Sequence, residues 1–336
     1  MVWADSFRVC TTIQFWGSAF FELSLVSVEQ RHAFPMCTEQ VIRSDAKLKP
    51  ASSGKGKRGR PSGSKTQDKT QATLNSELLH IKGMITALLV LIGGLFSLNY
   101  LLLDGHFGNN NALQMAQQAG LHLISKLRHD SELYLPYQGS DRRRKYGERI
   151  RPRQMSDKFL VNSSTEDGIR TEIYQLKKAL HKKFAQPLNI VIIVKTNLKS
   201  QVQAHVILFS SHLNLGYELL IDYYALRFQI EFNFRDAKQF WGLEDFMNTT
   251  ETGVTNAANL SLFMVNVSQR LLRDFRHNNP LLSVLDLKAA FRGYKYIEEV
   301  LKLLPQKLDP ILLASIFARL ANLGAIHPIP ASETTP

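Results

Sequence analysis

The chain has 336 residues, of which 44% are hydrophobic, so it is long enough to bury one large core or two smaller ones. Its 41 Lys and Arg residues exceed its 29 Asp and Glu residues, and the resulting net charge of +12 indicates a polyanionic partner, most commonly nucleic acid. Two cysteines, Cys10 and Cys37, are too few for a disulfide framework and lack metal-ligand spacing. With no secretory signal pattern at the first residues, a reducing cytoplasm is the expected compartment.

Two strand-like blocks near the start, Ala19–Glu29 and Met36–Ile42, predict a hairpin. The composition then changes. From Ser44 to Thr70, eight basic residues against two Asp residues give +6 amid Gly, Ser and Pro. Such a composition cannot build a core, so we expect residues 44–75 to form a disordered basic linker.

Inside this linker, Lys57-Arg58-Gly59-Arg60-Pro61 resembles an AT-hook. In such a motif an extended Arg-Gly-Arg lies in the narrow minor groove of A·T-rich DNA, where the negative potential is enhanced. Gly59 is required because a side chain there would hold the backbone off the groove floor. The alternative is non-specific contact of Arg58 and Arg60 with phosphates.

About nineteen uncharged residues run from Ile85 to Leu103, which is near the length that spans a bilayer. A membrane anchor is therefore one interpretation. The other divides the stretch at Gly93-Gly94 into a helix over about Ser76–Ile92 and a buried strand over Leu98–Leu103. The second interpretation places Asp104 at the carboxyl end of a strand, and we favour it.

After Asp104, Asn110–Gln118 predicts a helix and Leu121–Leu127 a strand. Residues 129–215 are richer in strand patterns and polar residues. Their best strand candidates are Glu172–Ala179, Leu188–Thr196 and Ala204–Ser210.

A second basic cluster lies inside this strand-rich region, at residues 142–153. It holds seven basic residues against Glu148: Arg142, Arg143, Arg144, Lys145, Arg149, Arg151 and Arg153. A solvated charged loop is the simplest interpretation. Contact with a DNA backbone is the functional one.

The segment from Tyr224 to Lys238 carries the most informative pattern. With about 100° per residue, a helix would bring four polar residues within roughly a 60° stripe of one face. They are Tyr224, Arg227, Glu231 and Lys238. The other positions are largely aromatic or aliphatic and predict a buried helix, in which a carboxylate needs a partner or a metal. The alternative is an Arg227–Glu231 ion pair on a solvated face.

Beyond Leu243, apolar residues recurring at three and four predict three more helices, over roughly Val254–His277, Val284–Leu304 and Pro310–Leu323.

The four in-line residues and the following Phe240-Trp241-Gly242-Leu243 resemble the Tyr-Arg-Glu-Lys signature of prokaryotic insertion-sequence transposases with a DDE active site, in the family numbered four. The segments Leu101–Asn109, Gly120–Arg128 and Thr255–Phe263 extend the likeness, which covers about Ala19 to Gln269. The resemblance implies an α/β fold with an RNase H-like mixed sheet, a β-rich insertion and a helical C-terminal region.

The same resemblance divides the chain by function. Residues 1–43 would be the first strands of the RNase H-like core, 76–128 its middle, 129–215 the insertion and 216–247 the helix with the signature. Residues 248–336 would form the helical C-terminal region. The implied partner is double-stranded DNA, both the transposon ends and the target. The resemblance further implies that the protein acts as a homodimer. It would be associated with the nucleoid in the cytoplasm and not with a membrane.

Phosphodiester transfer by two divalent ions needs carboxylates that converge from different elements. By resemblance, Asp104 is the second metal-binding acid and Glu231 the third, holding Mg²⁺ or Mn²⁺. Tyr224, Arg227 and Lys238 would bind phosphates of the transposon end. The implied reaction is hydrolysis at the 3′ end of the element, followed by attack of the freed 3′-hydroxyl on target DNA.

The first acid of the family is expected on a strand before Ala19, where Asp5 is the only acidic residue and no convincing motif surrounds it. We therefore expect an N-terminally truncated transposase with weak or no activity. A non-catalytic DNA-binding remnant, which could interfere with a full-length relative, is the alternative.

Overall fold

The computed structural model describes residues 20–40, 68–71, 73–95, 97–247, 250–277, 279–304 and 308–328, and the backbone alone of residues 7–14. The AT-hook-like Arg58, Gly59 and Arg60, and also Asp5, lie outside the described residues. The chain forms two compact units, Met1–Phe232 and Asn233–Pro336, and the boundary falls within one helix.

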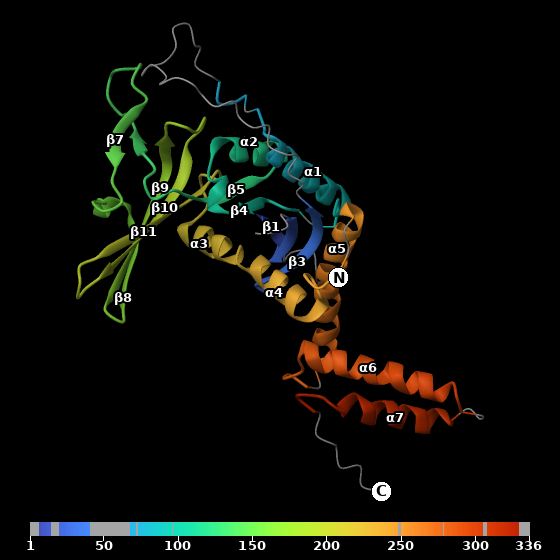
Figure 1. The fold of residues 1–336 in the computed structure, drawn as a ribbon. Helices are drawn as coiled ribbons and strands as arrows, with labels where there is room; N and C mark the ends of the chain where they lie inside the picture. The colour runs from blue at the N-terminus through green and yellow to red at the C-terminus, as the bar shows by residue number, and fades with distance from the viewer. Residues whose placement is uncertain are drawn as a thin grey trace, which may run out of the picture. The chain divides into compact units, whose positions relative to one another are not determined.

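The first unit is built on a mixed sheet of eleven strands in the described part of the chain (Figure 1). Its strands are β1 (Phe7–Gln14), β2 (Phe20–Ser27), β3 (His32–Gln40), β4 (Tyr100–Leu103), β5 (His122–Leu127), β6 (Leu133–Pro136), β7 (Tyr146–Ile150), β8 (Leu160–Glu166), β9 (Ile169–His181), β10 (Leu188–Asn197) and β11 (Gln203–Ser210). Its helices are α1 (Ser76–Leu91), η1 (Gly105–Phe107), α2 (Asn110–Gln118) and α3 (Tyr217–Leu226), followed by the start of α4 (Gln229–Trp241).

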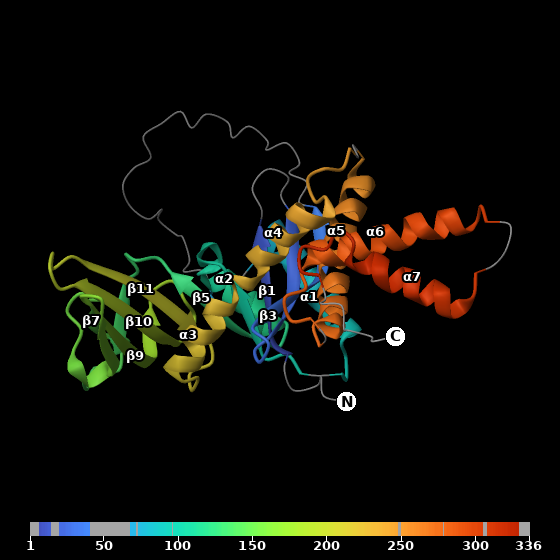
Figure 2. The same cartoon turned by 90° about the horizontal axis from the view of Figure 1, so that it is seen from below.

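The core of the sheet has the order β3-β2-β1-β4-β5, in which β1 and β4 are parallel and β2 is antiparallel to both β1 and β3. This is the RNase H-like arrangement expected from the sequence, with helices on both faces. The strands of the insertion continue the same sheet, because β11 pairs with the outer edge of β5 (Figure 2).

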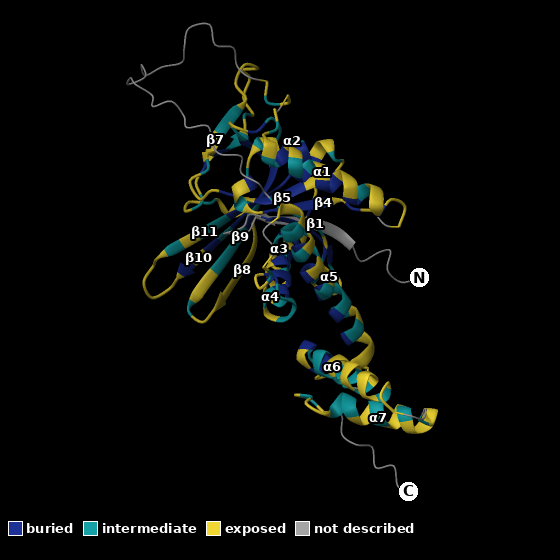
Figure 3. Cartoon of the chain, turned by 45° about the vertical axis from the view of Figure 1, so that its right-hand side comes forward, coloured by how far each residue is buried: buried dark blue, intermediate teal, exposed yellow. Residues whose placement is uncertain are grey.

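Strand β4 and most of β5 are buried (Figure 3). Because side chains alternate along a strand, these buried residues divide between the two faces of the sheet. On one face, Leu101, Leu103 and Leu123 pack with the apolar stripe of α1 and with α2. On the other, Leu102 and Ile124 pack with Leu220, Tyr223 and Leu226 of α3. Strand β4 is buried on both faces, and this explains its uninterrupted apolar sequence.

The uncharged stretch Ile85–Leu103 is therefore not one helix. Helix α1 begins at the Asn75 cap and ends at Leu91, a turn containing Gly94 at φ 81° follows, and the chain resumes as β4. The interpretation of this stretch as one membrane-spanning helix is therefore wrong. Among the described residues, no helix has the length and apolarity to cross a membrane.

A ring cluster lies at the starts of β4 and β5. His122 and His212 stack with their centroids 4.6 Å apart, and the hydroxyl of Tyr100 lies 2.8 Å from Nδ1 of His212. Burial lowers the pKa of His122, and the neighbouring His212 lowers it further. These contacts join the sheet to the connection that leads into α3.

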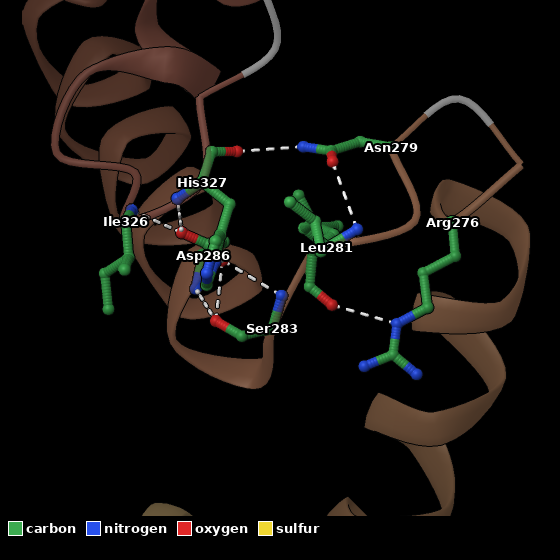
Figure 4. Close-up of polar contacts among 8 residues, drawn as sticks. Arg276, Asn279, Leu281, Ser283, Asp286, Ile326 and His327 are labelled. Atoms are coloured by element: carbon green, nitrogen blue, oxygen red, sulfur yellow. Dashed lines mark hydrogen bonds and ion pairs between the residues drawn. The ribbon is translucent and has the colours of Figure 1, made fainter.

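The second unit is helical and comprises the rest of α4, α5 (Glu251–Phe275), α6 (Val284–Leu301) and α7 (Pro310–Asn322). Asp286 in the first turn of α6 has a side chain that is 1% exposed. Its carboxylate accepts hydrogen bonds from Ser283 and from the backbone and ring of His327, so the start of α6 is joined to the segment after α7 (Figure 4).

Candidate functional site

Asp104 lies directly after the last residue of β4, where its position is fixed from two sides. Its carboxylate accepts a hydrogen bond from the backbone N–H of Gly105, 2.5 Å away, and so caps the short helix η1. Its backbone carbonyl accepts a hydrogen bond from the hydroxyl of Ser125 on β5, at 2.9 Å. The carboxylate is exposed at the end of a strand that is otherwise fully buried.

Helix α3 is positioned by the connection that precedes it. The buried side chain of Asn189 on β10 donates to the carbonyls of His212 and Leu215, at 3.1 and 2.8 Å. Further along the helix, Asp222 forms an ion pair with Arg31 in the turn between β2 and β3, at 2.5 Å. Neither anchor was recognisable in the sequence, because each joins residues remote along the chain.

The signature segment does not form the single helix that the sequence predicts. Helix α3 ends at Leu226, and α4 begins at Gln229. Between them, the N–H groups of Arg227, Phe228 and Glu231 bond to carbonyls three residues earlier instead of four, so the helical turn is tightened. Tyr224 thus belongs to α3, Arg227 caps its C-terminus, and Glu231 lies in the first turn of α4.

The predicted burial of this segment is also only partly correct. Ile230 and Phe234 are buried, but Phe228 is 48% and Phe232 is 44% exposed. The apolar pattern alone could not distinguish an exposed aromatic from a core one.

Two residues, Tyr224 and Arg227, lie between Asp104 and Glu231 within the first unit. Burial raises the pKa of the Tyr224 hydroxyl; Arg227, which is hydrogen-bonded to it, opposes this rise, and the nearby Asp104 carboxylate adds to it. Arg227 in turn donates from Nη2 to a carboxylate oxygen of Glu231 at 3.2 Å. Asp104 thus acts on Tyr224 through its charge, and Glu231 is hydrogen-bonded to the Arg227 that also interacts with Tyr224.

Arg227 and Glu231, although paired, differ in their exposure to solvent. Arg227 is buried, whereas the side chain of Glu231 is 46% exposed. The ion pair between them is therefore neither fully buried nor fully on a solvated face, the two arrangements that the sequence allows. Lys238, in the second unit, forms an ion pair with Glu244 at 2.5 Å.

Strand β1 occupies the place of the strand that would carry the first acid. Its backbone is in parallel register with β4, with Thr11 beside Leu102 and Thr12 beside Leu103. Its sequence, Phe-Arg-Val-Cys-Thr-Thr-Ile-Gln, contains no carboxylate. Strand β1 therefore precedes Ala19, where the sequence predicts the first acid, and residues 7–14 carry none.

The carboxylates of Asp104 and Glu231 are of the right chemical type to bind a divalent cation, but they are too few for a two-ion centre. Asp104 and Glu231 offer carboxylate oxygens, the ligands that Mg²⁺ prefers. Among the described residues, however, no three His, Cys, Asp or Glu side chains are grouped as metal ligands. A two-ion centre requires more carboxylates than this group supplies.

The basic cluster at residues 142–153 lies on the hairpin formed by β6 and β7. Arg142, Arg143 and Lys145 are exposed, and the guanidinium of Arg144 lies over the ring of Tyr137, 4.9 Å from its centroid. Arg149 forms an ion pair with Glu132 at 3.3 Å. Most of the positive charge of this hairpin is therefore available to an external anion.

Residues 16–181, just under half of the chain, match a family of proteins described as DDE superfamily endonuclease. The matched range includes Asp104 and ends before Tyr224, so it supports the family independently of the signature segment. No curated protein matches the chain. The fold and this match support a DDE-type, transposase-like nuclease, a class that acts on DNA and generally uses divalent metal ions.

Proposed function

We propose that this chain is a transposase-type protein of the Tyr-Arg-Glu-Lys, insertion-sequence-four-like group that binds duplex DNA but cleaves it weakly. The observation that carries the proposal is the hydrogen bond from Arg227 to Glu231 beside Tyr224, whose hydroxyl is influenced by the charge of Asp104. Strand β1, which pairs with β4, has no acid.

In this proposal the chain's own residues hold and orient a DNA strand. Arg227 and Tyr224 bind a phosphate close to Asp104, since a buried guanidinium with an uncommitted N–H group can fork to phosphate oxygens. Lys238 binds a further phosphate as a point charge. Arg142, Arg143, Arg144 and Lys145 contact the backbone elsewhere on the duplex.

A divalent ion, Mg²⁺ or Mn²⁺, would be held by Asp104 and Glu231 and would supply charge stabilisation for phosphodiester cleavage. With two acids instead of three, we expect its affinity to be low. The finer reaction, release of a 3′ end and its transfer to target DNA by a pair of protomers, requires the complete set of acids.

The experiment is a titration of a labelled 25-bp duplex with the purified full chain at several salt concentrations, followed by incubation of a supercoiled plasmid with Mg²⁺ or Mn²⁺. We expect the logarithm of the association constant for the duplex to fall steeply with the logarithm of the salt concentration. We also expect slow nicking of the plasmid. Absence of duplex binding would overturn the proposal.

A second candidate is a DNA-binding protein without catalytic activity, and the acid-free β1 favours it. The nicking assay separates the two. Metal-dependent nicking that disappears in Asp104→Asn supports a weak enzyme, and binding with no nicking by the wild-type chain supports the non-catalytic protein.

A further inference from the structure

We infer that Lys126 binds a DNA phosphate beside Asp104; this inference rests on the proposed function and extends its site. The starting observation is a cavity of about 320 Å³ at the end of β5. Asp104, Gly105, Lys126, Arg128, His129 and His205 are among its lining residues. A cavity that contains an acid of the proposed cleavage site and several cationic or polar groups suits a phosphodiester.

Lys126 and the end of β4 are held close together. The hydroxyl of Ser125 bonds to the carbonyl of Asp104 at 2.9 Å, and Lys126 is the next residue on β5. The side-chain stem of Lys126 packs over Gly105, where a Cβ atom would lie 3.6 Å from its Cβ and 3.8 Å from its Cδ. At Gly108 an added Cβ would collide with the Lys126 backbone carbonyl, so the loop after Asp104 requires glycine there to pack on this strand.

Lys126 also lies on the side of the sheet that faces α3. Ile124, two residues earlier, and Leu208, its register partner on β11, both pack with α3 in the same cluster. Because side chains alternate along a strand, Lys126 shares this face with them. Tyr224, which is close enough to Asp104 for the carboxylate to affect its pKa, belongs to that helix.

Charge pairing distinguishes Lys126 from the other basic group of the cavity. Arg128 is engaged by Asp130 through two hydrogen bonds, at 3.0 and 3.2 Å. Within the described part of the chain, Lys126 forms no ion pair, not even with Asp104. Lys126 is exposed, as expected of a lysine that acts as a point charge on phosphate.

The first test uses the unmodified full chain and a mixed-sequence 25-bp duplex. Lysine acetylation by a water-soluble acetyl ester is followed by peptide mass spectrometry with and without saturating duplex. We expect the duplex to slow acetylation of Lys126 several-fold more than that of Lys195, an exposed lysine on β10. Equal rates at Lys126 with and without duplex would overturn the inference.

The second test compares Lys126→Ala, Lys126→Arg and the matched control Lys195→Ala by salt titration of duplex binding. Lys126→Ala is expected to weaken binding about tenfold and to reduce the salt slope by about 0.9, and Lys126→Arg to restore both. An unchanged slope in Lys126→Ala, with wild-type binding intact, overturns this inference and leaves the proposed function standing. Loss of duplex binding by the wild-type chain overturns the proposed function itself.

Discussion

Arg227 and Glu231 form an unequal pair: their closest atoms are 3.2 Å apart, but the side chain of Arg227 is 7% exposed and that of Glu231 is 46% exposed. Arg227 Nε is buried and has no hydrogen-bond partner within the described residues. The buried cation therefore depends on a more exposed anion, on the hydroxyl of Tyr224 and on the ring of Phe228, 4.4 Å from its guanidinium carbon.

From this dependence we expect Glu231→Ala to lower the free energy of unfolding by about 1–3 kcal/mol, because the guanidinium loses a charged acceptor. Glu231→Gln retains an acceptor oxygen and is expected to cost less. Urea denaturation of the full chain measures both. Glu218→Ala, on the exposed side of α3, is the control and should change stability by less than about 0.5 kcal/mol. Equal losses in the two Glu231 variants would contradict the argument.

Asp104→Asn should separate metal binding from DNA binding. An amide oxygen can still accept the bond from Gly105 N–H, so η1 is retained, but the charge that attracts a cation is lost. We expect weaker Mn²⁺ binding by calorimetry and equal or tighter duplex binding, since a negative charge next to phosphates has been removed.

Asp167→Asn provides the matched control for that change. Asp167 occupies the exposed turn between β8 and β9 with φ 51°, a conformation that Asn also adopts readily. Its Mn²⁺ titration should equal that of the wild type. If both variants lose Mn²⁺ binding equally, Asp104 is not a metal ligand.

Strand β1 can be supplied with the acid it lacks. Thr11 and Thr12 stand beside Leu102 and Leu103, and adjacent strand positions face opposite sides of a sheet. We expect one of the two variants, Thr11→Asp or Thr12→Asp, to raise Mg²⁺-dependent plasmid nicking, because each adds a carboxylate to the strand that pairs with the end of β4. Nicking that stays at the wild-type level in both would argue that more than this acid is missing.

Much of the first unit could be predicted because local patterns determine it. The helix over Asn110–Gln118 was predicted to the residue, and the helix beginning at Ser76 ends one residue earlier than expected. The three strands expected between residues 172 and 210 are all present. In each case the spacing of hydrophobic residues and the residues of the flanking turns predict the same helix or strand.

What could not be predicted depends on long-range packing. The break between Tyr224 and Glu231 occurs where Arg227 turns inward, and propensity along the segment gives no sign of it. Strand β8 is exposed along its whole length and carries no apolar alternation, so it was missed. Lys126 is an exposed lysine between the buried Ser125 and Leu127 of β5, and the sequence pattern alone does not reveal its position beside Asp104.

Asp286 should control the stability of the helix pair α6 and α7. Burial would raise the pKa of its carboxyl, but the hydrogen bonds from Ser283 and His327 outweigh burial and hold the pKa well below its usual range. We expect Asp286→Ala to lower the local unfolding free energy by about 2–4 kcal/mol, since several buried donors lose their acceptor. Amide hydrogen exchange of residues 284–301 measures it.

The same pKa gives the sign of the pH dependence. A carboxyl with a depressed pKa stabilises the folded state above its unfolded pKa, near 3.9, and the stabilisation is lost as the pH falls toward the folded value. The difference between wild type and Asp286→Ala should therefore shrink below about pH 4. Asp309→Ala, which removes only the cap of α7, is the control and should cost about 1 kcal/mol. A difference that is constant down to pH 2 would contradict this assignment.

His122 should make the first unit sensitive to mild acid. Burial lowers the pKa of His122 and the stacked His212 lowers it further, so the unfolded chain binds this proton more readily than the folded one. The free energy of unfolding is then expected to fall as the pH drops below about 6.5. His122→Phe keeps a ring against His212 and removes this titration, so its urea midpoint should change less between pH 7.5 and 5.5 than that of the wild type. His212→Phe should also flatten the pH profile, because it removes the neighbouring positive charge that lowers the pKa of His122. It should cost more stability at pH 7.5 than His122→Phe, because it also removes the hydrogen bond with Tyr100. Parallel pH profiles for wild type and His122→Phe would show that the stacked pair does not carry the acid sensitivity.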